Sequence, residues 1–352
     1  MKSPSLRGWI NRSNLLVVTS ERMKIFRGEK SKRILLTALI WASCSISRCD
    51  GAVVLDPLGR FLAGHGYGGA QLVHLQNFFR VPIVSNGKAG DLIIDTGAPF
   101  SVVFRGSLGK LGLTETETQQ SVHGAFGRGR ERFGLTTIHS LTMGNCTLLN
   151  MPVAVASDNE GRGIFRRYGS SDGLFGLREM LKYGSILDLG NRLLFVRPNG
   201  PSKDIAQAVK SILAAEGYTA VDLAIARSHL RVAGSVNGLA CHFIVDTGAF
   251  FTSIDRDAAY KARIGGTRTE MVAEGIGRSG GEVSVARFPT LRIGSYEITN
   301  ASAAVAPLDA EILGRGTDSE TAGLLGAEYL GMNSAVFDFN SGTLYLKPKP
   351  TR

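Results

Sequence analysis

Two aspartates, Asp95 and Asp246, stand in matching surroundings. Each follows a short apolar run, at 92–94 and at 243–245, and each is followed by Thr-Gly-Ala. Two carboxyl groups held about 3 Å apart can share one proton. One of them can then take a proton from water while the other donates its proton to a carbonyl oxygen. A single carboxyl group cannot do both at once, but a chain with two such aspartates can supply both halves of a general acid–base pair.

The residues that follow each aspartate suit two loops that approach each other closely. Glycine has no Cβ and lets backbones come near, and a threonine hydroxyl can bond the opposite loop and lock the pair. One Asp-Thr-Gly alone is ordinary turn chemistry. The predicted supporting residues are Thr96, Gly97, Ala98, Thr247, Gly248 and Ala249.

The elements that must position these residues occur twice, because the chain is a tandem repeat. The halves match at an offset of 151 around the aspartates and at 150 after one residue is lost. The correspondence runs from about 71 to 200 and again from about 222 to 350. The later matches, 141–144, 153–157, 172–176 and 186–198, face 291–294, 303–307, 322–326 and 336–348.

Each copy is typical of β structure. The apolar runs before the aspartates end at turns, as buried strands do, and 132–144 and 282–294 alternate apolar and polar residues. Short helices are expected at 177–184, 253–263 and 327–331. A longer one is expected at 203–217, where four apolar residues form a stripe at helical spacing, docked between the two lobes.

On these residues the sequence resembles the retropepsin-like and pepsin-like aspartic proteases. Their mark is D-[TS]-G-[AS] followed by two apolar residues and glycine, which this chain has twice, the second part at 174–176 and 324–326. The resemblance implies a mainly β fold. It would have two homologous acid-protease-like β-barrel lobes related by a pseudo-twofold axis, with a connecting helix. It also implies an aspartic endopeptidase with Asp95 and Asp246 catalytic; the alternative is a non-catalytic peptide-binding protein on the same fold.

The same family closes a glycine-rich hairpin flap over its substrate. Segments 123–134 and 274–281 occupy that place here, one in each copy, as in a fused retropepsin dimer. Neither has the tyrosine of the pepsin flap. The candidate flap residues are Gly124, Phe126, Gly127, Gly275, Ile276 and Gly277.

Both loops read Asp-Thr-Gly-Ala, without the serine found at the fourth position in pepsins. A serine hydroxyl could bond the ionised carboxylate and lower its pKa, which alanine cannot do. We therefore expect a mildly acidic optimum.

The predicted organisation has five parts: a leader at 1–50, a flexible Gly-rich linker at 51–70, an N-terminal lobe at 71–200, a connecting helix at 201–217 and a C-terminal lobe at 218–352. In the leader, a basic stretch precedes an apolar run at 34–46, as in an export signal. We expect export to the periplasm or the exterior, with tethering through the leader or a lipidated Cys44 as alternatives.

Composition excludes other classes of function. The net charge of +10 comes mostly from the leader, so the nearly balanced body does not suggest a nucleic-acid surface. The six histidines have no metal-ligand spacing, so we expect no metal and no cofactor. The expected partner is a polypeptide substrate. We expect activity as a monomer, with pairing of each lobe across two chains as the alternative. The body holds only Cys146 and Cys241, whose pairing the sequence leaves open.

Overall fold

The computed structural model describes residues 56–75, 77–116, 121–123, 130–156, 171–274, 279–309, 313 and 321–348. All of them belong to one compact unit, Val54–Arg352. The predicted leader and Cys44 lie outside the described residues. Among the described helices, none is both long and apolar enough to cross a membrane.

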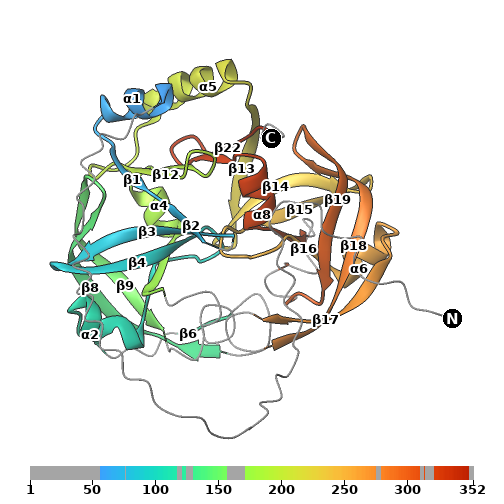
Figure 1. Cartoon of the computed structure of the whole chain (residues 1–352), viewed down its shortest axis with the longest axis horizontal. Helices are drawn as coiled ribbons and strands as arrows, with labels where there is room; N and C mark the ends of the chain where they lie inside the picture. The colour runs from blue at the N-terminus through green and yellow to red at the C-terminus, as the bar shows by residue number, and fades with distance from the viewer. Residues whose placement is uncertain are drawn as a thin grey trace, which may run out of the picture. The chain divides into compact units, whose positions relative to one another are not determined.

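The fold is mainly β, as predicted, and its first half forms a closed seven-stranded sheet (Figure 1). The order is β2-β3-β4-β10-β5-β9-β8, and a further pairing of β3 with β8 closes it into a barrel. The strands are β2 (Val73–Leu75), β3 (Phe78–Ser85), β4 (Lys88–Asp95), β5 (Val102–Phe104), β8 (Gly134–Met143), β9 (Cys146–Ala156) and β10 (Gly173–Gly176).

The second half repeats this arrangement, as the duplicated sequence predicts. Its strands run β13-β14-β15-β20-β16-β19-β18-β17, and β14 pairs again with β18. They are β13 (Thr219–Ala226), β14 (His229–Val236), β15 (Leu239–Val245), β16 (Ser253–Asp255), β17 (Gly266–Glu274), β18 (Ser279–Ile293), β19 (Tyr296–Ala306) and β20 (Thr321–Leu325).

The two halves join through a pair of short strands that reveals the pseudo-twofold axis. β11 (Ile186–Asp188) pairs antiparallel with its own repeat copy, β21 (Val336–Asp338). Ile186 faces Asp338 and Asp188 faces Val336, with Leu187 opposite Phe337 at the centre. Exchanging each residue for its copy reproduces the same pairs, so the axis passes beside Leu187 and Phe337.

Flanking strands extend this junction into a continuous sheet that belongs to both lobes. Its order is β1-β12-β11-β21-β22-β13, with β1 (Gly68–Gln71), β12 (Leu193–Val196) and β22 (Thr343–Leu346). Buried apolar side chains from both lobes, Phe79 and Phe243 among them, also form one hydrophobic cluster. The lobes are therefore held together by a sheet and a shared core.

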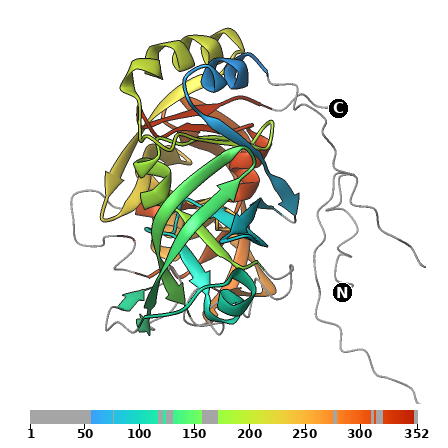
Figure 2. The ribbon, with the colours of Figure 1, turned by 90° about the vertical axis from the view of Figure 1, so that its left-hand side faces the viewer.

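The predicted connecting helix is present as α5 (Ala206–Ala215), preceded by a 3₁₀ turn, η3 (Lys203–Ile205). Its apolar stripe is buried, as expected: Ile205, Val209 and Leu213 join a cluster with Ile186 and Tyr345 of the junction sheet. The helix therefore covers one face of the sheet that joins the lobes, rather than wedging between two separate barrels (Figures 1 and 2).

The prediction of a flexible linker at 51–70 was wrong for its described part. α1 (Pro57–Ala63) begins after Asp56, whose carboxylate accepts a hydrogen bond from the Gly59 N–H at 2.7 Å. This is N-terminal capping with proline at the first helical position. Leu58 and Leu62 are buried beside α5, and β1 then pairs with β12. The Asp-Pro pair signalled this helix, but the glycines that follow it suggested irregular structure.

The remaining described helices are short. α4 (Leu177–Lys182), α6 (Arg256–Lys261) and α8 (Ala327–Met332) lie at the three predicted places. α2 (Leu108–Leu111), with a 3₁₀ turn, η2 (Arg105–Ser107), before it, was not predicted. Cys146 and Cys241 are both free thiols, which settles the pairing that the sequence left open.

Candidate active site

Asp95 and Asp246 stand at the carboxyl ends of two buried strands. The three apolar residues that lead to each aspartate are almost fully inaccessible to solvent. β10 lies parallel to β4, and β20 lies parallel to β15, so each apolar–apolar–glycine turn runs beside its aspartate loop. A Cβ on Gly176 would lie 2.3 Å from the Phe100 carbonyl carbon, so only glycine permits this contact. The bracing implied by the family resemblance is present in both lobes.

The two threonines lock the loops to each other. The backbone N–H of Thr96 donates to Thr247 Oγ1, and the N–H of Thr247 donates to Thr96 Oγ1, each at 3.0 Å. Each hydroxyl then donates across the axis, Thr96 Oγ1 to the Val245 carbonyl and Thr247 Oγ1 to the Ile94 carbonyl, both at 2.7 Å. All four groups are satisfied by the other lobe, so the loops have one fixed relative position.

The glycines bring the two carboxyl groups together. A Cβ on Gly97 would lie 2.4 Å from Cγ of Asp246, and a Cβ on Gly248 would lie 2.4 Å from Cγ of Asp95. The carboxyl groups also hydrogen-bond to each other. The pair that the sequence predicted is therefore assembled within one chain.

Backbone N–H groups hold each carboxyl in place. Oδ1 of Asp95 accepts from the N–H groups of Gly97 and Ala98, both at 2.9 Å. Oδ1 of Asp246 accepts from the next two residues of its own loop, at 2.9 and 3.0 Å. Because two donors bind Oδ1 of each carboxyl, the orientation of both side chains is fixed.

Burial raises the pKa of both carboxyl groups. It is the largest cause for Asp95, whose pKa is raised although Ala98 and Gly97 donate to it. The pKa of Asp246 is raised further, because the charge of Asp95 adds to the effect of burial. Two interacting carboxyls lose their protons in two steps that belong to the pair. Between those steps the pair holds one proton, which is the state that acid–base chemistry needs.

Two glutamates that the sequence reasoning missed hold the segments after the aspartate loops. Oε2 of Glu179 accepts from the Ser101 N–H at 2.7 Å, and Oε1 of Glu328 accepts from the N–H of Thr252, the copy of Ser101. The two glutamates lie in the first turns of α4 and α8. They are 149 residues apart, so the repeat register of 150 did not match them.

The two glutamates differ in their charge partners. Arg178 Nε lies 2.7 Å from Glu179 Oε1. Glu328 Oε2 is buried and has no hydrogen-bond partner within the described part of the chain. Burial raises the pKa of Glu328 to about 7.

Hairpins occupy the two predicted flap positions. In the first copy, β6 (Ser121–His123) pairs with β7 (Arg130–Arg132), and in the second copy β17 pairs with β18. Both hairpins lie at the lower end of the molecule in Figure 1. The candidate flap residues at their tips, Gly124, Phe126, Gly127, Gly275, Ile276 and Gly277, lie outside the described residues.

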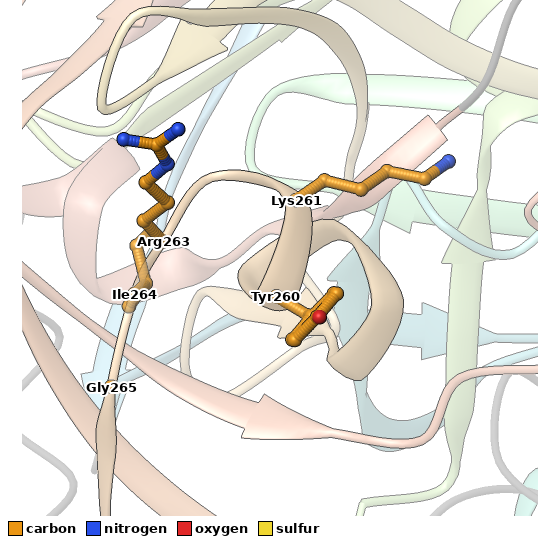
Figure 3. A pocket seen from close by; sticks show the side chains of 5 residues that line it. All are labelled: Tyr260, Lys261, Arg263, Ile264 and Gly265. Atoms are coloured by element: carbon orange, nitrogen blue, oxygen red, sulfur yellow. The ribbon is translucent and has the colours of Figure 1, made fainter.

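A surface hollow of about 450 Å³ lies apart from these loops, on α6 and the turn after it. Tyr260, Ile264 and Gly265 line it together with Lys261 and Arg263, whose side chains extend in opposite directions (Figure 3). None of these residues belongs to an aspartate loop. Over the residues that the structure covers, no group of three or more His, Cys, Asp or Glu is placed to hold a metal ion.

A known protein family matches each half of the chain once. A family model described as Aspartyl protease matches residues 81–178 and 232–329. An aspartic proteinase from Irpex lacteus is 15% identical, with a TM-score of 0.49 over 80% of this chain and 97% of that one. Basic 7S globulin from soybean is 10% identical, with a TM-score of 0.48 over 80% of this chain and 95% of that one. Among curated proteins, none matches the sequence.

Proposed function

Because the chain belongs to the aspartyl protease family, whose model matches more than half of it, we propose that it is an aspartic endopeptidase with Asp95 and Asp246 as its catalytic residues. The observation that carries the proposal is the contact between the two buried carboxyl groups. A structural turn needs neither a second carboxyl nor a cross-lobe lock. Burial raises the pKa of both carboxyls, and the charge of Asp95 raises that of Asp246 further. Such perturbed pairs are typical of catalytic sites.

The proposed reaction uses a water molecule held between the carboxyls. The ionised carboxylate takes a proton from the water, whose oxygen attacks the carbonyl carbon of the scissile peptide bond. The protonated carboxyl donates its proton to the carbonyl oxygen, giving a neutral tetrahedral intermediate. Collapse of this intermediate breaks the C–N bond as the first carboxyl passes the proton taken from water to the leaving nitrogen. One hydroxyl of the intermediate returns its proton to the second carboxylate as the product carbonyl forms, so the pair again holds one proton.

This mechanism needs only groups that the chain supplies. No covalent bond to the enzyme forms, and the substrate is a polypeptide. Both carboxyls come from one chain, so we propose that the monomer is active. Retained specific activity on dilution to nanomolar concentration, with a monomer mass by light scattering, supports this, and loss of activity with dilution contradicts it.

The test of the reaction is cleavage of a mixed peptide library, read by mass spectrometry. Asp95→Asn and Asp246→Asn are each expected to lose at least about a thousandfold in kcat/KM while keeping the native circular dichroism spectrum. Asp222→Asn, which changes an exposed carboxyl on β13, is the matched control and should retain full activity. Asp95 and Asp246 are called the dyad. Substantial turnover by either of their asparagine variants would refute the proposal. Binding of a statine peptide without any turnover by the wild type would favour the non-catalytic peptide-binding alternative.

A further inference from the structure

Each lobe sends a tight hairpin to the aspartate loop of the other lobe. In the first lobe, β2 and β3 are joined by a turn containing Asn77, and in the second β13 and β14 are joined by a turn containing its copy, Ser228. Both residues have positive φ, 67° and 64°, so the two turns bend alike. The amide of Asn77 donates to the Phe250 carbonyl at 3.4 Å.

The residue after each turn differs between the lobes. In the first hairpin it is Phe78, whose ring lies edge-on to the Phe250 ring with centroids 5.7 Å apart. In the second it is His229, whose ring hydrogen-bonds the backbone of Gly97. His229 Nδ1 is buried and has no partner in the described part of the chain. The nitrogen that donates to the Gly97 carbonyl is therefore Nε2.

The acceptor of this bond belongs to a peptide unit that also serves the dyad. The Gly97 carbonyl and the Ala98 N–H are the two ends of one peptide group, and that N–H donates to Asp95 Oδ1 at 2.9 Å. A donor at the carbonyl end polarises the group and makes its N–H a stronger donor. The hydrogen bonds thus form a chain from the His229 ring to the Asp95 carboxylate.

We propose that His229 is a positioning residue that makes the dyad asymmetric, by strengthening through the Gly97–Ala98 peptide the hydrogen bond that stabilises ionised Asp95. Phe78, in the matching place, has no polar hydrogen to give the other loop. Asp95 is then the carboxylate that takes the proton from water, and Asp246 is the acid that protonates the carbonyl oxygen. This division of roles rests on the proposed function, whereas the effect on the dyad's titration does not.

The surroundings of His229 favour the neutral form of its ring. Burial is the main cause of its lowered pKa, and the charge of Arg231, on the same strand, adds to it. On β13 the residue paired with His229 is Ala226, which carries no charge. Continuing the β14–β15 register by two residues from Arg231 and Ile244 places Asp246 across from His229. Asp95, the last residue of β4, accepts a hydrogen bond from the same peptide group that His229 contacts. Nε2 carries a hydrogen both in this neutral tautomer and in the charged ring, so it remains a donor in either form.

The test measures the dyad's titration directly, by carbon NMR of the protein labelled at the aspartate carboxyl carbons. His229→Phe places the copy's residue at this position and removes the donor. The lower pKa of the dyad is expected to rise by roughly half a unit. The acid limb of kcat/KM should move to higher pH by the same amount, about threefold in rate on that limb, with KM unchanged.

Two further variants separate positioning from packing. His229→Gln keeps a neutral N–H donor and should restore the wild-type pKa and acid limb. His139→Phe, at an exposed site on β8, is the matched control and should change neither. If His229→Phe does not fold, His229→Met removes the donor with a flexible side chain and carries the same expectation.

The outcomes distinguish this inference from the proposed function. A dyad pKa that is unchanged in His229→Phe or His229→Met overturns the inference. A shift that His229→Gln does not reverse also overturns it, because the cause would then be packing. Full activity of Asp95→Asn would refute the proposed function instead, and the NMR titration would still report on His229.

Discussion

Thr96 and Thr247 are bound to each other by reciprocal hydrogen bonds, each from a backbone N–H to the other hydroxyl at 3.0 Å. Because each hydroxyl also donates to a carbonyl of the opposite lobe, removing one hydroxyl leaves two backbone groups of the other lobe without a partner. Both threonines are fully buried. Water therefore cannot replace the lost bonds without a change in structure.

This relationship predicts the effect of changing Thr96 on stability. Thr96→Val should lower the free energy of unfolding by about 2–4 kcal/mol, because it orphans the Thr247 N–H and the Val245 carbonyl. Urea denaturation measures it. Thr96→Ser keeps the hydroxyl and should cost less than about 1 kcal/mol, and so should the exposed change Thr137→Val. Equal destabilisation by valine and serine at position 96 would contradict this explanation.

The close approach of the loops predicts that alanine is not tolerated at Gly97. Its Cβ would lie 2.4 Å from Cγ and Oδ1 of Asp246, so the carboxyl must move away from its partner. Gly97→Ala is expected to lower kcat/KM by at least about a hundredfold, since displacements of about 1 Å cost that much. Gly109→Ala is the control, because nothing lies within 4 Å of a Cβ there. Near wild-type activity of Gly97→Ala would show that the dyad needs no such contact.

Because each aspartate loop ends in alanine, we predict that catalytic activity has its acid limb at mildly acidic pH. Burial raises the pKa of both carboxyls, and a raised pKa moves the acid limb of activity to higher pH. Ala98→Ser offers a hydroxyl to the ionised pair and should move the acid limb of kcat/KM down by roughly half a unit. Ala89→Ser, at an exposed site on β4, the strand that ends at Asp95, should leave the limb in place. A strongly acidic optimum in the wild type would contradict the argument.

The raised pKa of the buried Glu328 carboxyl leads us to predict that the folded protein loses stability as pH rises. Its pKa is about 7, above the ordinary 4.5, so folding favours the protonated form. The stabilisation is complete below about pH 4.5 and is lost as pH rises through about 7. At pH 8, Glu328→Gln should be more stable than the wild type by roughly 2–3 kcal/mol, and at pH 4.5 the two should be nearly equal. Urea denaturation at the two pH values measures this.

The copy of this glutamate provides a matched comparison. Glu179 is paired with Arg178 and accepts from the Ser101 N–H. Glu179→Gln breaks that ion pair and should destabilise the protein at both pH values. If Glu328→Gln instead destabilises the protein equally at both pH values, the unpartnered oxygen of Glu328 does not cause the predicted pH dependence.

The sequence by itself determined the duplication, the two aspartates and their threonine and glycine neighbours. These are local signals repeated in register, and a repeat at fixed spacing carries its own evidence. The apolar stripe of 203–217 likewise predicted a helix with its buried face, because helical periodicity is a property of the segment alone. The mainly β, two-lobed architecture followed from the same repeat and from the family resemblance.

Only the tertiary structure decided which groups touch across the axis. The junction of β11 with β21, the place of α1 on it and the bond from His229 to Gly97 join residues far apart in the chain. No local pattern encodes such contacts, because they depend on how two complete lobes dock. The same reason explains the two glutamates. A shift of one residue between the two helices removes them from register in the sequence, yet they accept from corresponding backbone N–H groups, those of Ser101 and Thr252.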